Sequence, residues 1–309
     1  MEGAVAGAVA GAAGSSAVRA LVAGPVRGAR VVLATSLATY LALDLDDDAL
    51  PGRPPVVAVL ARQAVRVPVG ILIPQDAVPQ DQDAAVGGVT PGHAGPGAGW
   101  LVGGGEARLG SRAWRVGRWW NPEVPALGPW RPDGVGPTPL AHLTRLAARL
   151  PIGAELTRPG EAALAEALRR PDQAGLAAAV AGLVGLGDGL TPEGDDVLAG
   201  ALVALAASDG GQGRARQVRR RLAAVVRERL DATTTVSAAL LEQAALGRAI
   251  PELIDVLRWC ASPQSASTGR PGQSGGDAVD RLLAVGHSSG AALARGMLLG
   301  LTETGEAAP

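Results

Sequence analysis

The residues most able to do chemistry are concentrated at positions 185–196, directly before the apolar run Val197–Leu205. The pair Thr191-Pro192 predicts a helix start, because threonine caps helices and proline fits the first helical position. Glycines there expose backbone N–H groups, which together with the helix dipole favour an anion. Two adjacent aspartates in the first turn could hold a Mg²⁺ ion bridging to a phosphate, or clamp a substrate directly. The candidate residues of this segment are Gly187, Gly189, Thr191, Gly194, Asp195 and Asp196.

Two further segments of the C-terminal half have the same character. The run 233–237 (Thr-Thr-Thr-Val-Ser) precedes a predicted helix, where hydroxyl groups either cap backbone N–H groups or bind an anion together with them. The run 286–290 matches the G-x-S-x-G turn of α/β-hydrolases, which requires a preceding strand and a later histidine. Residues 278–285 have helical spacing instead, and no histidine follows, so the sequence excludes that triad. The candidates are Thr234, Ser237, Ser288, Ser289 and Gly290 for anion binding and His287 for catalysis or a purely structural role.

Three helix starts carrying glycines or hydroxyls therefore fall in one half of the chain. If they converge, they form a pocket for a small anion such as a carboxylate, a phosphate or a carbamoyl group. A structure that places Thr191, Thr234 and Ser288 far apart would contradict this hypothesis. The competing interpretation is a set of well-capped helices whose glycines serve only close packing.

The composition narrows the possible mechanisms. The 309 residues include no lysine, so all 28 basic residues are arginine, and a lysine Schiff base or a Walker-type phosphate loop is excluded. A single cysteine excludes an internal disulfide and a cysteine-rich metal site. Neither His93 nor His142 has a partner at metal-binding spacing, so no metal ligand is assigned. The net charge of -1 argues against a nucleic-acid partner.

Short apolar runs broken by proline and glycine predict strands as far as about Trp120, and helical spacing begins after Pro139. We therefore expect an α+β protein, with a β-rich N-terminal half packed on an all-helical C-terminal domain. The expected domains are residues 1–135 and 136–309. The Ala/Gly run Gly3–Ala13 is expected to be a packed helix or a tail. Five of the six tryptophans lie between Trp100 and Trp130, where core bulk is favoured over a ligand cage.

No targeting or membrane segment is expected. Glu2 precedes the apolar N-terminal run and the first arginine is Arg19, unlike the positive start of a signal peptide. The same run is too short and too rich in glycine to span a bilayer. We expect a cytoplasmic protein without a membrane partner.

Together, these segments resemble the AllH-like family, named after a subunit of the oxamate carbamoyltransferase of allantoin catabolism. The similarity is carried by Gly187-Asp-Gly-Leu-Thr-Pro-Glu-Gly-Asp-Asp-Val-Leu-Ala-Gly200, by the hydroxyl run 233–237 and by Val285-Gly-His-Ser-Ser-Gly290 with the later Gly296 and Gly300. Trp120-Asn121-Pro122 matches a weaker motif, which makes Asn121 a further candidate. The chain departs from the family pattern at Ala292, where an acidic residue is usual.

The resemblance implies transfer of a carbamoyl group between oxalurate and phosphate, giving oxamate and carbamoyl phosphate, with other carbamoyltransferase subunits as partners. In such a site, Thr191, Ser288 and Ser289 would hold phosphate or carboxylate oxygens. Asp195 and Asp196 would position the amine or a metal ion. Two alternatives stay open: a non-catalytic anion-binding or scaffold subunit, and a stand-alone enzyme acting on a related small substrate.

Overall fold

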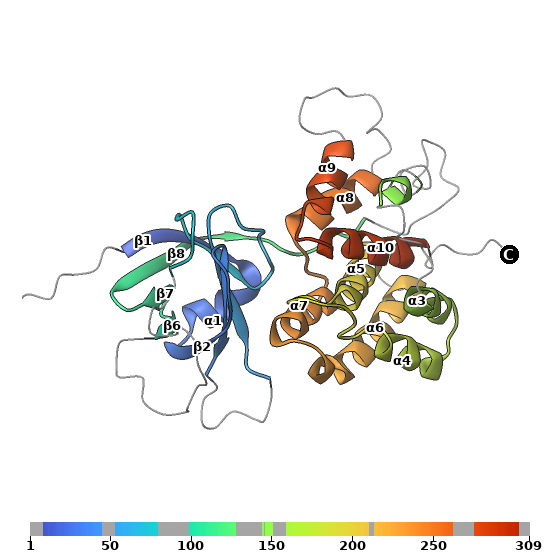
Figure 1. Cartoon of the computed structure of the whole chain (residues 1–309), viewed down its shortest axis with the longest axis horizontal. Coiled ribbons are helices and arrows are strands. Elements are labelled where there is room, and N and C mark those ends of the chain that lie inside the picture. The colour runs from blue at the N-terminus through green and yellow to red at the C-terminus, as the bar shows by residue number, and fades with distance from the viewer. Residues whose placement is uncertain are drawn as a thin grey trace, which may run out of the picture. The chain divides into compact units, whose positions relative to one another are not determined.

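The computed structural model describes residues 9–44, 53–79, 99–127, 144, 146–150, 159–209, 213–261 and 275–302. The chain divides after Pro122 into two compact units (Figure 1). The first contains an eight-stranded β-barrel and the second consists mostly of helices, which confirms the α+β class and its order along the chain.

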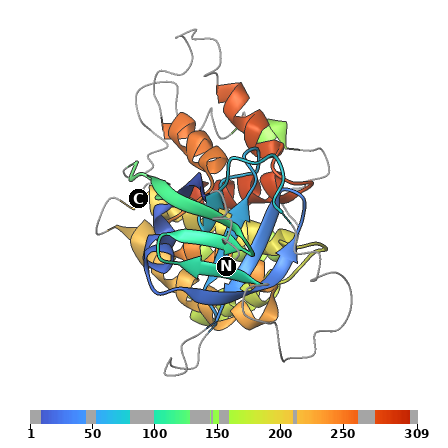
Figure 2. The same ribbon diagram turned by 90° about the vertical axis from the view of Figure 1, so that its left-hand side faces the viewer.

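The eight strands of the first unit close into a barrel, which is turned toward the viewer in Figure 2. Their order around the barrel is β1-β5-β4-β3-β2-β6-β7-β8, and β1 closes the ring by pairing parallel to β8. Every residue of β4 is buried, as a continuous apolar run predicts. The elements are β1 (Val9–Ser15), α1 (Arg19–Ala23), β2 (Arg27–Ala34), β3 (Ala38–Leu43), β4 (Val56–Leu60), β5 (Gly70–Leu72), β6 (Trp100–Gly103), β7 (Glu106–Leu109) and β8 (Arg112–Trp120).

The expectation for the Ala/Gly run is wrong where the structure describes it, because its residues from Val9 onward belong to strand β1 rather than to a helix or tail. Pairing with β5 on one side and β8 on the other satisfies the backbone of this strand, and such tertiary pairing outweighs the helix propensity of alanine. The small residues also have a packing role. A Cβ at Gly14 would lie 2.7 Å from a ring atom of Trp119. Residues 1–8 lie outside the described residues.

The tryptophans of the barrel include two that supply core bulk. Trp100 and Trp114 are buried, and their rings stack with centroids 5.7 Å apart. The indole N–H of Trp114 donates to Oε1 of Gln75 at 3.0 Å, so its polar atom is satisfied. The core interpretation is therefore confirmed for these two residues, whereas Trp130 lies outside the described residues.

Helix α5 forms the centre of the second unit, and α10 packs along it (Figure 1). Nearly all of α5 is buried, in agreement with its apolar sequence. Among the described residues, no helix is both long and apolar enough to cross a membrane. The helices are α3 (Pro159–Arg169), α4 (Gln173–Ala181), α5 (Glu193–Ala207), α6 (Arg214–Glu228), α7 (Thr235–Ala245), α8 (Pro251–Ala261), α9 (Gly275–Leu283) and α10 (Ser289–Thr302).

The boundary between the units lies before the residue 135 expected from the sequence. The backbone N–H groups of Val124 and Leu127 donate to the carbonyls of Gly247 and Ala207, 2.9 and 2.8 Å away. These bonds tie the segment after Pro122 to the helical unit, although its proline-rich composition resembles that of a linker. Residues 128–143 lie outside the described residues.

Glycines set the close spacing of α5 and α10. A Cβ added at Gly296 would overlap the carbonyl oxygen of Val197, and one at Gly200 would overlap that of Leu293. We expect Gly296→Ala to lower the free energy of unfolding by about 1–3 kcal/mol, because the two helices must move apart. Gly182→Ala is the matched control, since its nearest neighbours would be 3.6 Å away. Urea unfolding checks this, and equal midpoints for the two variants would contradict the packing role of Gly296.

Candidate functional site

Asp195 joins the start of α5 to two other segments, the glycine-rich turn and the start of α7. Its side chain is 1% exposed. Oδ1 accepts the backbone N–H of Gly185 at 2.9 Å, and Oδ2 accepts the hydroxyls of Thr233 and of Ser237, the latter at 2.7 Å. Both carboxylate oxygens are thus engaged by donors from the glycine-rich turn and from the start of α7. This arrangement makes Asp195 an organiser of the site.

Thr234 joins the glycine-rich turn to α7. As the N-cap of α7 it accepts the backbone N–H of Ser237 at 3.0 Å, which confirms the capping role predicted from the hydroxyl run. Its own hydroxyl donates to the carbonyl of Leu190 at 2.8 Å. The start of α7 therefore lies beside the residue that precedes Thr191.

Thr191 links the starts of α5 and α10. Its hydroxyl lies 3.0 Å from that of Ser289, the first residue of α10. The sequence predicts Thr191 as the helix cap, but the N-cap of α5 is Pro192, with no side-chain capping bond. The threonine hydroxyl turns to a neighbouring helix start instead. The three helix starts thus lie side by side, as the hypothesis of a shared pocket requires.

Asp196 differs from Asp195 in what surrounds it. Its side chain is 8% exposed, and burial raises the pKa of its carboxyl to about 7. Hydrogen bonds from Ser289 and Thr191 oppose that rise in pKa, while the neighbouring charge of Asp195 adds to it. Within the part of the chain that the structure describes, Oδ2 of Asp196 has no hydrogen-bond partner. A buried carboxyl that has one oxygen without a hydrogen-bond partner and a pKa near neutral is typical of a binding or acid–base group.

The candidate glycines fall into two groups. Gly187 and Gly189 have φ values of +111° and +101°, which favour glycine and let the turn fold tightly before α5. Gly194 and Gly290 instead allow close packing, since a Cβ would overlap the carbonyl oxygens of Leu183 and Leu282 respectively. For these two positions the structure shows a packing reason that needs no ligand.

The remaining candidates lie around the cluster or apart from it. His287 and Ser288 are exposed just before α10. Asn121 is exposed after β8 in the first unit, and the cluster is built without it. Ala292 is fully buried one turn into α10. His93 and His142 lie outside the described residues.

The Mg²⁺ ion suggested for the two aspartates stays a prediction. Within the described ranges, no group of three or more His, Cys, Asp or Glu side chains is placed to hold a metal ion. Both oxygens of Asp195 already accept hydrogen bonds from N–H or O–H donors, which a metal ion would displace. Asp196 alone retains a free carboxyl oxygen among the described residues of this cluster.

Sequence reasoning missed a buried ionic group next to the cluster. Arg295 of α10 is 2% exposed, and its Nε and Nη2 lie 2.9 Å from Oε1 of Glu161 and 2.5 Å from Oε1 of Glu193. Three helices, α3, α5 and α10, are joined by this triad. The available signal was the position of Arg295 inside the apolar run 291–301, where a charged side chain predicts buried ionic partners.

Two arginines of the run that opens α6 bind carbonyl groups at the end of α3. Arg214 and Arg221 donate to the carbonyls of Arg169 and Arg170, 2.6 and 3.1 Å away. Arg219 pairs with Asp209 at 3.3 Å. Cations beside the last carbonyls of a helix complement its dipole, so these contacts explain much of the run without a ligand.

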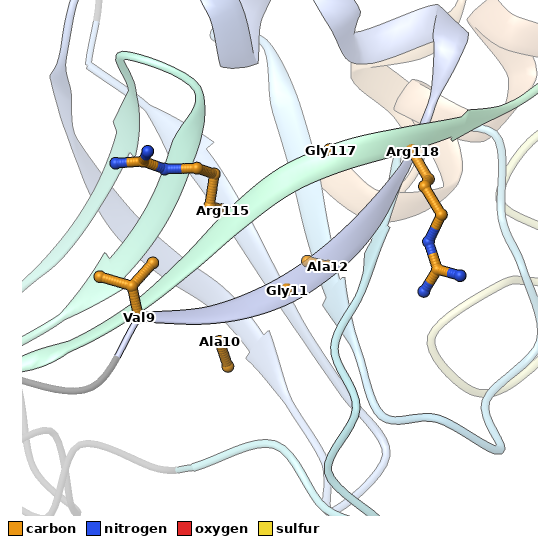
Figure 3. Close-up of a pocket in the computed structure, with 7 residues that line it drawn as sticks. All are labelled: Val9, Ala10, Gly11, Ala12, Arg115, Gly117 and Arg118. Atoms are coloured by element: carbon orange, nitrogen blue, oxygen red, sulfur yellow. The ribbon is translucent and has the colours of Figure 1, made fainter.

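A shallow groove of about 510 Å³ follows β1 and β8 on the barrel (Figure 3). Its two charged side chains, Arg115 and Arg118, point away from one another in Figure 3. Arg115 is also paired with Glu106 at 2.8 Å. The groove therefore lacks the convergent polar groups of the cluster in the helical unit.

Comparison with known proteins agrees with the resemblance. Residues 183–301 match the family model of oxamate carbamoyltransferase subunit AllH. The matched region runs from the turn after α4 into α10 and contains Asp195, Asp196, Thr234 and Ser289. Comparison with curated proteins and with solved structures found no match.

Proposed function

We propose that the helical unit binds a small anion of a carbamoyl-transfer reaction where α5, α7 and α10 begin. The observation that carries the proposal is the buried Asp196 carboxyl, with one free oxygen among the described atoms and contacts to the hydroxyls of Thr191 and Ser289. The match to a carbamoyltransferase subunit over these same helices supports the choice of reaction. Because that family is named as a subunit, we also propose that the chain works in a complex with other carbamoyltransferase subunits.

The residues have distinct roles in this proposal. The hydroxyls of Thr191, Ser288 and Ser289 hold carboxylate or phosphate oxygens. Asp195 positions two segments through the hydrogen bonds that it accepts. One is the glycine-rich turn, which includes Gly187 and Gly189. The other is the start of α7, which includes Thr234 and Ser237. Gly194 and Gly290 allow the helix starts to approach closely. His287 is exposed just before α10 and is available to a ligand, whereas Asn121, exposed in the first unit, is proposed to contact a partner subunit.

Asp196 supplies the proton chemistry. When phosphate attacks the carbamoyl carbon of oxalurate, a C–O bond forms and the C–N bond to oxamate breaks. The attacking phosphate loses a proton and the leaving nitrogen gains one. A carboxyl with a pKa of about 7 is suited to pass that proton, because both of its protonation states are populated at neutral pH. Oriented donors at the helix starts would stabilise the charge that develops on oxygen.

The pH dependence of oxamate binding tests the role of Asp196. Below about pH 7 the carboxyl is protonated and donates to the anion, whereas above this pH it is charged and repels the anion. We expect the Kd for oxamate to rise about tenfold from pH 6 to pH 8, because the competent fraction falls by that factor. Oxamate is the chosen probe since its own charge is constant over this range. Calorimetric titration measures the Kd.

The matched variants are Asp196→Asn and Asp188→Asn. The amide at position 196 keeps a donor at all pH values, so its Kd is expected to be the same at pH 6 and pH 8. Asp188 is exposed in the same turn, and its variant controls for the loss of one negative charge. A wild-type Kd that is independent of pH, or an equal effect of the two variants, would contradict the proposal.

Activity of the purified chain separates an enzyme from a binding subunit. Incubation with carbamoyl phosphate and oxamate yields oxalurate only if the chain is catalytic by itself, and Asp196→Asn is then expected to abolish the product. Oxamate binding without product would remove the catalytic part of the proposal and leave a non-catalytic subunit. Product from the chain without any other subunit would favour a stand-alone enzyme.

A further inference from the structure

The first turns of α6 line an open cavity of about 530 Å³ in which arginine predominates. Its volume is typical of small-molecule sites. The lining includes no carboxylate and no aromatic side chain among the residues that the structure describes. The lining residues are Gly213, Arg214, Arg216, Gln217, Arg220 and Arg221.

Three exposed lining residues form a row along one face of α6. Arg214, Gln217 and Arg220 are spaced three positions apart, and side chains at this spacing are neighbours on a helix surface. In the described part of the chain, the side chains of Gln217 and Arg220 form no hydrogen bond or ion pair. Arg214 donates from Nη2 to the carbonyl of Arg169 at 2.6 Å, and its other N–H groups have no partner among the same residues. The row therefore presents two guanidinium groups on either side of a carboxamide.

The positive charge of this row is not balanced locally. Among the described residues, neither Arg214 nor Arg220 pairs with a carboxylate, and Arg221 donates to the carbonyl of Arg170. The carbonyls that end α3 carry about half a negative charge, and the start of α6 carries about half a positive one. These dipole charges offset one another, so the positive charge of the arginines remains and favours an anion.

The type of cation and the length of the site narrow the class of anion. A guanidinium group presents a planar fork of N–H donors that binds phosphate oxygens in pairs. The lining residues lie within positions 213–221 of one helix, so the site is only about 12 Å long. A compact ligand with linked phosphates fits this length, whereas single-stranded nucleic acid usually stacks its bases on aromatic side chains.

We infer that this cavity binds a small molecule with two or more linked phosphate groups, held by Arg214, Gln217 and Arg220. The inference is independent of the proposed anion site. Arg219, beside the row, pairs with Asp209 just after the end of α5, whereas Asp196 lies in the first turn of that helix. The 15 residues of α5 span about 22 Å, so the two sites lie toward opposite ends of α5.

Pyrophosphate is the probe for this site. In calorimetric titrations at constant ionic strength, we expect it to bind at least about tenfold more tightly than inorganic phosphate. The second phosphate adds hydrogen bonds to a second charged group, and such a bond contributes more than the free energy of one decade in Kd. A triglutamate peptide is expected to bind at least about tenfold more weakly than pyrophosphate, because it loses more conformational freedom on binding.

Two variants of exposed residues test the row. Arg220→Gln removes one guanidinium group and is expected to weaken pyrophosphate binding at least about tenfold. Gln217→Glu places a negative charge between the two arginines and is expected to abolish binding. Arg227→Gln is the matched control, since Arg227 is exposed on the same helix but does not line the cavity. Its Kd is expected to change by less than about twofold, because salt screens exposed charges at that separation.

Chemical modification locates the bound anion without a variant. Pyrophosphate is expected to slow the reaction of phenylglyoxal with Arg214 and Arg220 but not with Arg227, as measured by mass spectrometry of peptides. The inference is overturned if phosphate or triglutamate binds as tightly as pyrophosphate, or if pyrophosphate shows no saturable binding at millimolar concentrations. Pyrophosphate bound only at the Asp196 site would leave the affinity of Arg220→Gln and Gln217→Glu equal to that of the wild type, which also overturns it.

Discussion

Replacing Asp195 by alanine is expected to lower the free energy of unfolding by about 3–5 kcal/mol, one of the largest effects of any single change in this chain. The reason is that Gly185, Thr233 and Ser237 would each lose a charged acceptor, and Asp195 and Ser237 are both buried. Buried donors left without partners cost more than the lost bonds themselves. Urea unfolding followed by circular dichroism measures the change.

The exposed Asp188 in the same turn is the control, and Asp188→Ala is expected to change the unfolding free energy by less than about 0.5 kcal/mol. Hydrogen exchange adds a local readout. In Asp195→Ala, the amide of Gly185 and those that open α7 are expected to exchange faster than in the wild type. An unchanged urea midpoint in Asp195→Ala would show that the three bonds do not organise the site.

The second large effect is expected for Arg295→Met, which leaves Glu161 charged and 2% exposed without its cation. Breaking a buried ion pair from one side costs about 3–5 kcal/mol, because the remaining charge is uncompensated. The unfolding free energy from urea titrations measures this loss. Adding Glu161→Gln in the same chain removes the stranded charge, so the double variant is expected to recover a large part of the lost stability.

Arg281→Met is the matched control for the loss of one arginine. Arg281 is half-exposed and lies 3.4 Å from Asp255, and exposed pairs of this kind contribute at most about 1 kcal/mol. Equal losses in Arg295→Met and Arg281→Met would contradict the buried triad. So would a double variant that is no more stable than Arg295→Met alone.

Local sequence signals located much of the candidate site. The position of Thr234 directly before a predicted helix predicts an N-cap, and Thr234 is the N-cap of α7 in the structure. Glycines next to Thr191-Pro192 predict a tight turn and a helix start, and α5 begins at Glu193. These features depend on neighbouring residues only, which is why residue types and spacing suffice to predict them.

Other features depend on neighbours that are distant in the sequence. The run that forms β1 has the composition of a helix, and only pairing with β5 and β8 makes it a strand. The partners of Arg295 come from α3 and α5, more than 100 positions earlier in the chain, and no local pattern identifies them.

The residue types and their order were enough to locate the helix starts, to exclude lysine- and cysteine-based mechanisms and to indicate an anion-binding site. They could not separate Asp195 from Asp196, which are adjacent and chemically identical. Folding surrounds Asp195 with three hydrogen-bond donors, and it buries Asp196 against two hydroxyls with one oxygen free among the described atoms. Burial and long-range hydrogen bonds set the pKa of a carboxyl and determine whether its oxygens are free to bind a ligand. The two aspartates therefore become different only in the folded chain.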